Sequence, residues 1–326
     1  MLDFQHVKNV TCRSIVDSPH ATKAVVCISA DSNTIAAYKA HTHHHISSAP
    51  VVDPDTGVIC GMLDYVDLAD FLLHKGVDGL QLEATARTLV DRSMKDPFYS
   101  TGIDSPILNA IEVLGMGIHR IVLMNDAISK TDIPKPSERI CGVLSQSDLL
   151  RWILKEQQGK RDNDFLLPLS HLIKITYPAV SVNPSELLIE AIRKMRVNSV
   201  SSVAVVEKNN LIVGHLSASD LQYLIFKKDP KSFLFQPVLP FISMVLSEIG
   251  ISRGGDRYPY YDVYEDTPLI NVIEKLLATS THRVWVVENP ATSPNRAGSA
   301  HPKLLGVVSM TDIIDGVFKP KSGHEY

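Results

Sequence analysis

Four copies of one short motif run along this chain of 326 residues, and they constrain its fold more than any other feature. Each copy begins with Gly, carries Ser or Asp three residues later, and ends with Asp six residues after the Gly. The copies span residues 61–67, 142–148, 214–220 and 306–312. A motif that recurs at long, similar intervals indicates an array of related structural units, so we expect four such units.

Apolar patterns around the motifs predict the elements of each unit. A short strand-like run precedes each Gly, for example at 203–206 and 284–287. Upstream of it, apolar residues three and four apart predict a helix, as at Ile107, Ile111 and Leu114. Each unit therefore reads strand, helix, strand, strand, helix: a small α/β unit with a β-sheet covered by helices on one face. Because a unit of about 60 residues is marginal alone, we expect the units to pair sheet to sheet.

The units alternate, which divides the chain into two pairs. Ser47-Ser48 and Ser201-Ser202 precede the second strand of units one and three, whereas His119-Arg120 and His282-Arg283 stand there in units two and four. We place the break between the pairs in the polar run 157–164. The predicted modules are residues 1–160, with units at about 14–75 and 92–157, and residues 161–326, with units at about 168–228 and 245–320.

The alternation has a chemical interpretation. Small hydroxyl residues leave room for a flat ring and offer hydrogen bonds, while Arg grips phosphate oxygens and His adds a donor that titrates. An Asp at a helix start can accept hydrogen bonds from a ribose, and a helix N-terminus attracts anions. Together these groups describe an adenine nucleotide site. The interpretation requires that the guanidinium of an even-numbered unit point into the same cleft as the serines of its odd-numbered neighbour.

With these motifs, the chain resembles four tandem cystathionine-β-synthase (CBS) domains paired into two Bateman modules. Within that family it is most similar to the gamma subunit of AMP-activated and sucrose-non-fermenting kinases. The likeness is carried by segments 281–287 and 306–313 for the last unit, 200–206 for the third and 47–50 for the first. The resemblance implies a regulatory subunit of a protein kinase that binds AMP, ADP or ATP, with no further cofactor and no catalytic residue.

The resemblance also implies a set of nucleotide-binding residues. They are Thr176, Ser181, Ser201, Ser202, Asp220, His282, Arg283, Ser309, Thr311, Asp312, His119, Arg120 and Asp148. The chain departs from the family at four positions. Asp64 and Val66 replace hydroxyl residues in unit one, which argues against a nucleotide site around Asp67. In unit two, Ser147 stands where the gamma subunit has a phosphate-binding Lys and Asp148 where it has a basic residue, so a site around Asp148 is not inherited from that subunit.

Three alternatives remain open. The motif is also a helix-capping pattern that needs no ligand. A second reading is an interaction scaffold or phosphatase regulator with little or no nucleotide binding, and a third is a protein that binds an S-adenosyl ligand without phosphate clamps.

Other sequence features exclude several classes of function. The net charge of −4 argues against nucleic-acid binding, and no apolar run is long enough to span a membrane. No phosphate-binding loop, nucleophile elbow or zinc-protease motif is present, so we expect a non-enzyme. We interpret 41–45, rich in His, as the polar end of a helix rather than a metal site, and the four Cys as reduced core thiols. The expected partners are an adenine nucleotide and kinase subunits or a phosphatase, in the cytoplasm and also the nucleus.

Overall fold

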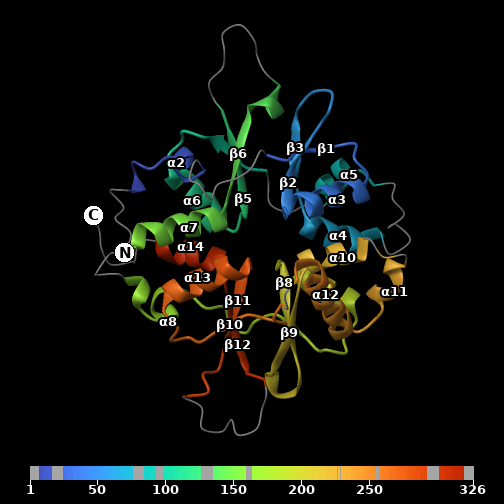
Figure 1. The fold of residues 1–326 in the computed structure, drawn as a ribbon, viewed down its shortest axis with the longest axis vertical. Helices are drawn as coiled ribbons and strands as arrows, with labels where there is room; N and C mark the ends of the chain where they lie inside the picture. The colour runs from blue at the N-terminus through green and yellow to red at the C-terminus, as the bar shows by residue number, and fades with distance from the viewer. Residues whose placement is uncertain are drawn as a thin grey trace.

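Four small sheets with flanking helices make up the chain (Figure 1). The computed structural model describes residues 7–16, 25–75, 84–92, 98–125, 135–158, 164–225, 227, 229–254, 257–291 and 301–318. Each sheet has three strands in chain order, the first parallel to the middle strand and the last antiparallel to it. This is the α/β architecture of four repeated units that the motifs predict.

The four units have the following elements. Unit one contains β1 (Ile28–Ser29), α3 (Thr34–His44), β2 (Ser48–Val52), β3 (Ile59–Asp64), α4 (Tyr65–Lys75) and α5 (Ala86–Arg92). Unit two contains α2 (Cys12–Val16), β4 (Ser100–Gly102), α6 (Ile107–Gly115), β5 (Arg120–Met124), the 3-10 helix η2 (Pro136–Arg139), β6 (Ile140–Ser145) and α7 (Gln146–Gln157).

The second half repeats this order with additions. Unit three contains β7 (Ser181–Val182), α9 (Leu188–Val197), β8 (Ser202–Val206), η4 (Lys208–Asn210), β9 (Ile212–Ser217), η5 (Ala218–Leu221), α10 (Gln222–Ile225), α11 (Pro230–Leu234) and α12 (Val238–Arg253). Unit four contains η3 (Asp164–Leu166), α8 (Leu169–Leu172), β10 (Asp262–Val263), α13 (Leu269–Thr279), β11 (Arg283–Val287), β12 (Leu304–Ser309) and α14 (Met310–Phe318).

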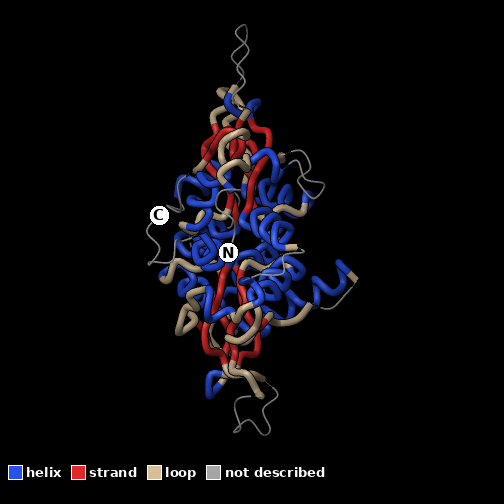
Figure 2. Tube along the Cα trace, turned by 90° about the vertical axis from the view of Figure 1, so that its left-hand side faces the viewer, coloured by secondary structure: helices blue, strands red, loops and turns tan. Residues whose placement is uncertain are grey.

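The hydrophobic cores join units from opposite halves of the chain. One core contains Ala49 and Leu68 of unit one together with Leu188 and Val203 of unit three. A second core joins units two and four through the helices α6, α7, α13 and α14. In Figure 1 these helices lie in the middle of the molecule, between the upper and lower sheets, and the strands run outward along the long axis (Figure 2). Burying the helical faces therefore docks the two halves.

A smaller core joins the sheets of units three and four, as expected for units that pair sheet to sheet. It contains Ala204 and Ile212 on one sheet and Trp285 and Leu304 on the other, all at most 2% exposed. An isolated antiparallel bridge between Thr176 and Val307 adds backbone hydrogen bonds between segment 164–180 and β12. The second half thus has its own sheet-to-sheet contact.

The segments at the start of each half pack on the even-numbered unit. Residues 7–16 hydrogen-bond to residues 103–107 of unit two, and Arg13 forms an ion pair with Asp104. Leu169 similarly donates its N–H to Thr267 O in unit four. The predicted break at 157–164 lies largely outside the described residues, which omit 159–163.

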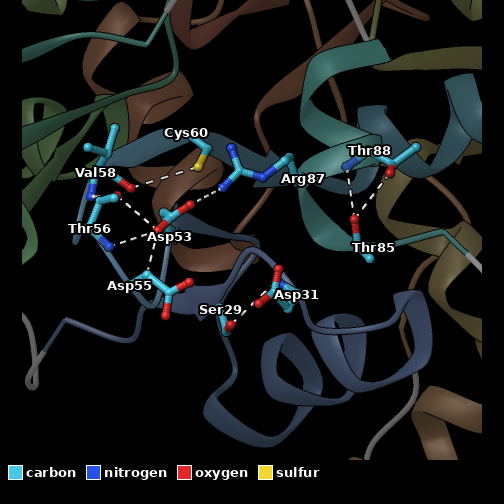
Figure 3. Close-up of polar contacts among 10 residues, drawn as sticks. All are labelled: Ser29, Asp31, Asp53, Asp55, Thr56, Val58, Cys60, Thr85, Arg87 and Thr88. Carbon is cyan, nitrogen blue, oxygen red and sulfur yellow. Dashed lines mark hydrogen bonds and ion pairs between the residues drawn. The ribbon is translucent and has the colours of Figure 1, made fainter.

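At the outer end of unit one, a side-chain network fixes the β2–β3 turn (Figure 3). Asp53 accepts hydrogen bonds from the N–H groups of Asp55 and Thr56 and pairs with Arg87 on α5. The pKa of Asp53 is lowered, chiefly by the Thr56 hydrogen bonds. These contacts hold α5 against the sheet that it covers.

The prediction of four core thiols is wrong. All four Cys are free, but only Cys12 is buried, while Cys27 and Cys141 are exposed and Cys60 is half-buried. Cys60 and Cys141 stand at equivalent positions, one residue before the motif Gly in β3 and β6. Alternation along a strand places them on the opposite face from that Gly.

Candidate functional site

The loops that enter the four middle strands meet at the centre of the molecule. In every unit the first residue of the middle strand pairs with the last residue of the third strand, as Arg120 does with Ser145 and Arg283 with Ser309. This register places each loop beside the motif that starts the next helix. A cavity of about 100 Å³, here called the central pocket, lies where these loops converge. Its lining includes Ser47, His119, Arg120, Ser201, His282 and Arg283.

The two arginines point at the serines of the neighbouring unit. The Nη2 of Arg283 donates to the Ser201 hydroxyl over 2.8 Å, and its Nη1 donates to the Ser202 carbonyl over 3.3 Å. Arg120 donates in the same way to the Ser47 hydroxyl. In each half, the guanidinium of the even-numbered unit therefore lies in the cleft of its odd-numbered neighbour. This confirms the geometry that the alternation requires.

Both guanidiniums are desolvated and have only neutral hydrogen-bond partners. Burial lowers the pKa of Arg283 to about 10, an effect that the charge of Asp312 opposes. Burial also lowers the pKa of Arg120, against the charges of Asp64 and Asp148. Within the described residues, the acceptors for these two side chains are hydroxyls and a carbonyl. Among these described residues no carboxylate forms an ion pair with either guanidinium, and because a desolvated charge without an ion-pair partner is costly, the central pocket is suited to an anion.

Two histidines from different halves stack at this point. The rings of His119 and His282 lie 5.8 Å apart between centroids, at an interplanar angle of 16°. Burial, together with the charge of Arg120, lowers the pKa of His282 to about 3. The His282 Nδ1 atom is buried and has no hydrogen-bond partner among the described residues. His282 is therefore neutral at pH 7 and adds no positive charge to the pocket.

The four motif Asp residues act as helix caps. Asp312 accepts hydrogen bonds from the N–H and the hydroxyl of Ser309, at 2.7 and 2.6 Å. Asp148 and Asp220 form the same reciprocal contacts with the Ser three residues before them. Asp67 receives the backbone N–H of Asp64, which shows that Asp can replace Ser in the motif without loss of the cap. The capping interpretation thus accounts for the recurrence of Asp without a ligand.

Seven of the predicted nucleotide-binding residues do not line the central pocket. They are Thr176, Ser181, Asp220, Ser309, Thr311, Asp312 and Asp148. The hydroxyl of Thr311 accepts a hydrogen bond from Gln146 at the contact between α7 and α14. Thr176 is bridged to Val307 through the backbone. The polar groups predicted to surround a ribose in unit four are therefore engaged within the protein.

Other pocket residues escaped the sequence interpretation. His215, Arg257 and Tyr261 line the pocket from the side of the second half, and Ser217 and Ser219 line it at the start of η5. His215 is held with its Nδ1 2.8 Å from the Pro259 carbonyl, and burial lowers its pKa against the charge of Asp220. The available signal was position, because the residue after the motif Gly is apolar in the other three units but His in unit three.

The His-rich segment 41–45 forms the end of α3 and residues 42–45 are exposed, which is the polar helix end that the sequence suggested. His41 is the exception: it is fully buried, and its ring contacts those of Tyr38 and Tyr65 at centroid distances of 5.4 and 5.6 Å. Among the described residues, no group of three or more His, Cys, Asp or Glu side chains is arranged to hold a metal ion. Throughout the described residues, no helix combines the length and apolar character needed to cross a membrane.

Comparison with known proteins supports the fold from two directions. Residues 170–227 and 257–319, which belong to units three and four, match the family model for the CBS domain. The crystal structure of MJ1225 from Methanocaldococcus jannaschii, described as an archaeal homologue of gamma-AMPK, superposes with a TM-score of 0.70. That superposition covers 94% of this chain and 99% of the archaeal one, at 14% identity. At this identity the likeness concerns the fold alone.

The curated relatives carry a different name from the kinase subunit. Protein SDS23 of Kluyveromyces lactis is 28% identical over 85% of this chain and 57% of its own length. Protein SDS23 of Scheffersomyces stipitis is 31% identical over 70% of this chain and 47% of its own length. Protein SDS24 of Saccharomyces cerevisiae is 26% identical over 81% of this chain and 53% of its own length. The chain thus spans about half the length of these relatives.

These findings refine the expected kinship. The four-unit architecture matches a gamma-type structure, whereas the sequence is similar to proteins named SDS23 and SDS24. The matched units, the shared topology of all four sheets and the superposition agree: units three and four are CBS domains, and the chain as a whole has a fold like that of Bateman modules.

Proposed function

We propose that this regulatory CBS-domain protein binds one phosphate-bearing ligand, an adenine nucleotide, in its central pocket. The ligand then governs contact with a partner, either a protein kinase or a phosphatase. The observation that carries the proposal is the pair of desolvated guanidiniums of Arg120 and Arg283, one from each half, whose hydrogen-bond partners are neutral. Phosphate supplies the missing negative charge and matches the planar fork of Arg.

The surroundings favour a nucleotide over free phosphate on the side of unit three. Ser217 and Ser219 place hydroxyls beside the pocket where η5 begins, and Tyr261 and Arg257 offer flat groups that can face a ring. Asp64 also lines the pocket, and its charge disfavours phosphate in direct contact with it. We therefore place the phosphates between the two arginines and the nucleoside towards Tyr261.

Titration with AMP, ADP and ATP tests this proposal. A ligand at 100 times its dissociation constant stabilises the protein by about 2.7 kcal/mol and raises its melting temperature. Replacing Arg283 by Ala removes a charged hydrogen bond and should weaken binding by about 1.5–3 kcal/mol, or roughly 10- to 150-fold. Arg193→Ala is the matched control, because Arg193 pairs only with Glu190 on the surface. Equal affinity in Arg283→Ala and wild type would contradict the assignment of the pocket.

A second candidate function is a scaffold or phosphatase regulator that binds little or no nucleotide. It is favoured by the caps formed by Asp148 and Asp312 and by the engagement of Thr311 with Gln146. The similarity to SDS23 and SDS24 also fits this second function better than it fits a kinase subunit. Under this proposal, purified phosphatase or kinase subunits bind the chain with the same affinity with and without ATP. A nucleotide-dependent change in that affinity argues for the first function.

A further inference from the structure

The stacked histidines of the central pocket are the feature on which this inference rests. His119 enters from the loop before β5 and His282 from the loop before β11, so the stack joins the two halves of the chain. Arg120 and Arg283 follow these residues directly in the sequence, and both line the same pocket. The pair therefore lies between two fixed positive charges.

In the free protein the surroundings of the pair keep His282 neutral at pH 7. His282 is surrounded by the positive side chains of Arg120 and Arg283, and Asp64 is the carboxylate that acts on it in the opposite sense. Arg257 and His215 complete the pocket on the side of the second half. Asp148 and Asp312 act on the two arginines from the starts of α7 and α14.

We propose that the central pocket binds its phosphate-bearing ligand together with a proton, which is held by the His119–His282 pair. The proposal rests on the proposed function and concerns the regulation of the same site. A phosphate group brings a charge of about −1.5 to −2 at pH 7, which outweighs the local effect of either guanidinium. The buried Nδ1 of His282 has no hydrogen-bond partner within the part of the chain that the structure describes, and in the cationic ring it is a donor for a phosphate oxygen.

The consequence is that acidification strengthens binding. In the free protein His282 stays neutral because burial and Arg120 hold its pKa at about 3. In the complex the anion raises that pKa, so one proton enters with the ligand at any pH between the two values. Affinity then rises by up to about tenfold for each unit that the pH falls within this window.

Calorimetric titration with ATP in buffers of different ionisation enthalpy measures the proton directly. At pH 6.5 the wild-type protein should take up between about 0.5 and 1 proton per ATP more than His282→Gln. Protonation of ATP itself is common to both titrations and cancels in the difference. The proton number is obtained independently of affinity, so weaker binding by the variant does not confuse the result.

Sulfate provides a second measurement that needs no variant. Sulfate does not titrate between pH 5.5 and 8, so a change in its affinity with pH reports the protein alone. We expect wild-type protein to bind sulfate more tightly at pH 5.5 than at pH 8.

The outcomes separate the inference from the function beneath it. The proton-coupled site is overturned if wild type and His282→Gln bind ATP with equal proton uptake and the affinity for sulfate does not change with pH. That result leaves the proposed nucleotide function in place. If neither ATP nor sulfate binds, the proposed function fails and the inference falls with it.

Discussion

Replacing Arg283 by Met should leave the free protein at least as stable as wild type while weakening its response to nucleotide. Burial lowers the pKa of Arg283 from 12.5 to about 10. At pH 7 a shift of this size means that the charged side chain costs the fold about 3 kcal/mol relative to an uncharged one. Met fills similar space but gives up the charged hydrogen bonds to Ser201 and Ser202, each worth about 1.5 kcal/mol at the low end of the usual range. The two effects nearly cancel, so the expected free energy of unfolding is equal to that of wild type or slightly higher.

Urea denaturation with and without ATP checks this expectation. Without ligand, Arg283→Met should unfold at a urea concentration equal to or slightly higher than that of wild type. With ATP at 100 times its dissociation constant, wild type gains about 2.7 kcal/mol and becomes the more stable of the two. Arg193→Met, at an exposed ion pair worth about 0–1 kcal/mol, should change neither result. The reasoning about an unpaired buried charge is refuted if Arg283→Met, without ligand, is less stable than wild type by more than about 1 kcal/mol.

Three further predictions concern the cap, the motif glycine and pH. Ser309→Ala should cost about 1 kcal/mol of stability through loss of a helix cap, and calorimetry should find nucleotide affinity unchanged; a tenfold loss would restore this residue to the ligand site. Gly306→Ala places a methyl group 2.7 Å from the Thr176 carbonyl and should lower the free energy of unfolding, measured in urea, by about 1–3 kcal/mol. The control Gly214→Ala meets nothing closer than 3.8 Å and should be tolerated, so equal losses of stability in the two variants would contradict the prediction. Because the folded pKa of His282 is about 3, lower than the unfolded 6.5, its contribution to stability is complete above pH 6.5 and falls by about 2 kcal/mol from pH 6.5 to 5; an equal loss in His282→Gln would exclude it as the cause.

The repeat predicted the fold because its information is local. Apolar spacing and the motif Gly and Asp specify a strand, a helix start and a turn within a few residues, and these elements form as expected in all four units. The alternation of Ser-Ser with His-Arg also predicted the contacts of Arg120 with Ser47 and of Arg283 with Ser201. Adjacent units pair across a pseudo-symmetric sheet contact, so residues at equivalent positions meet.

The arrangement of the halves was not predictable from the same pattern. All four units present similar apolar helices, and nothing in their spacing says that unit one docks on unit three and unit two on unit four. The stacking of His119 on His282 depends on that docking, as does the single pocket at the centre. The motif Asp residues were ambiguous because a helix cap and a ribose acceptor need the same side chain at the same place, and only coordinates show which hydrogen bonds it makes.

The exchange of cores between the halves has a consequence for how the polypeptide can be divided. Each large core takes helices from both sides of residue 160, so a fragment that ends there would expose the apolar surfaces of both cores to water. Either fragment expressed alone should aggregate or stay unfolded, whereas the two fragments expressed together should associate and form the complete fold. The four repeated units are therefore expected to fold as one cooperative domain that cannot be cut between its two halves.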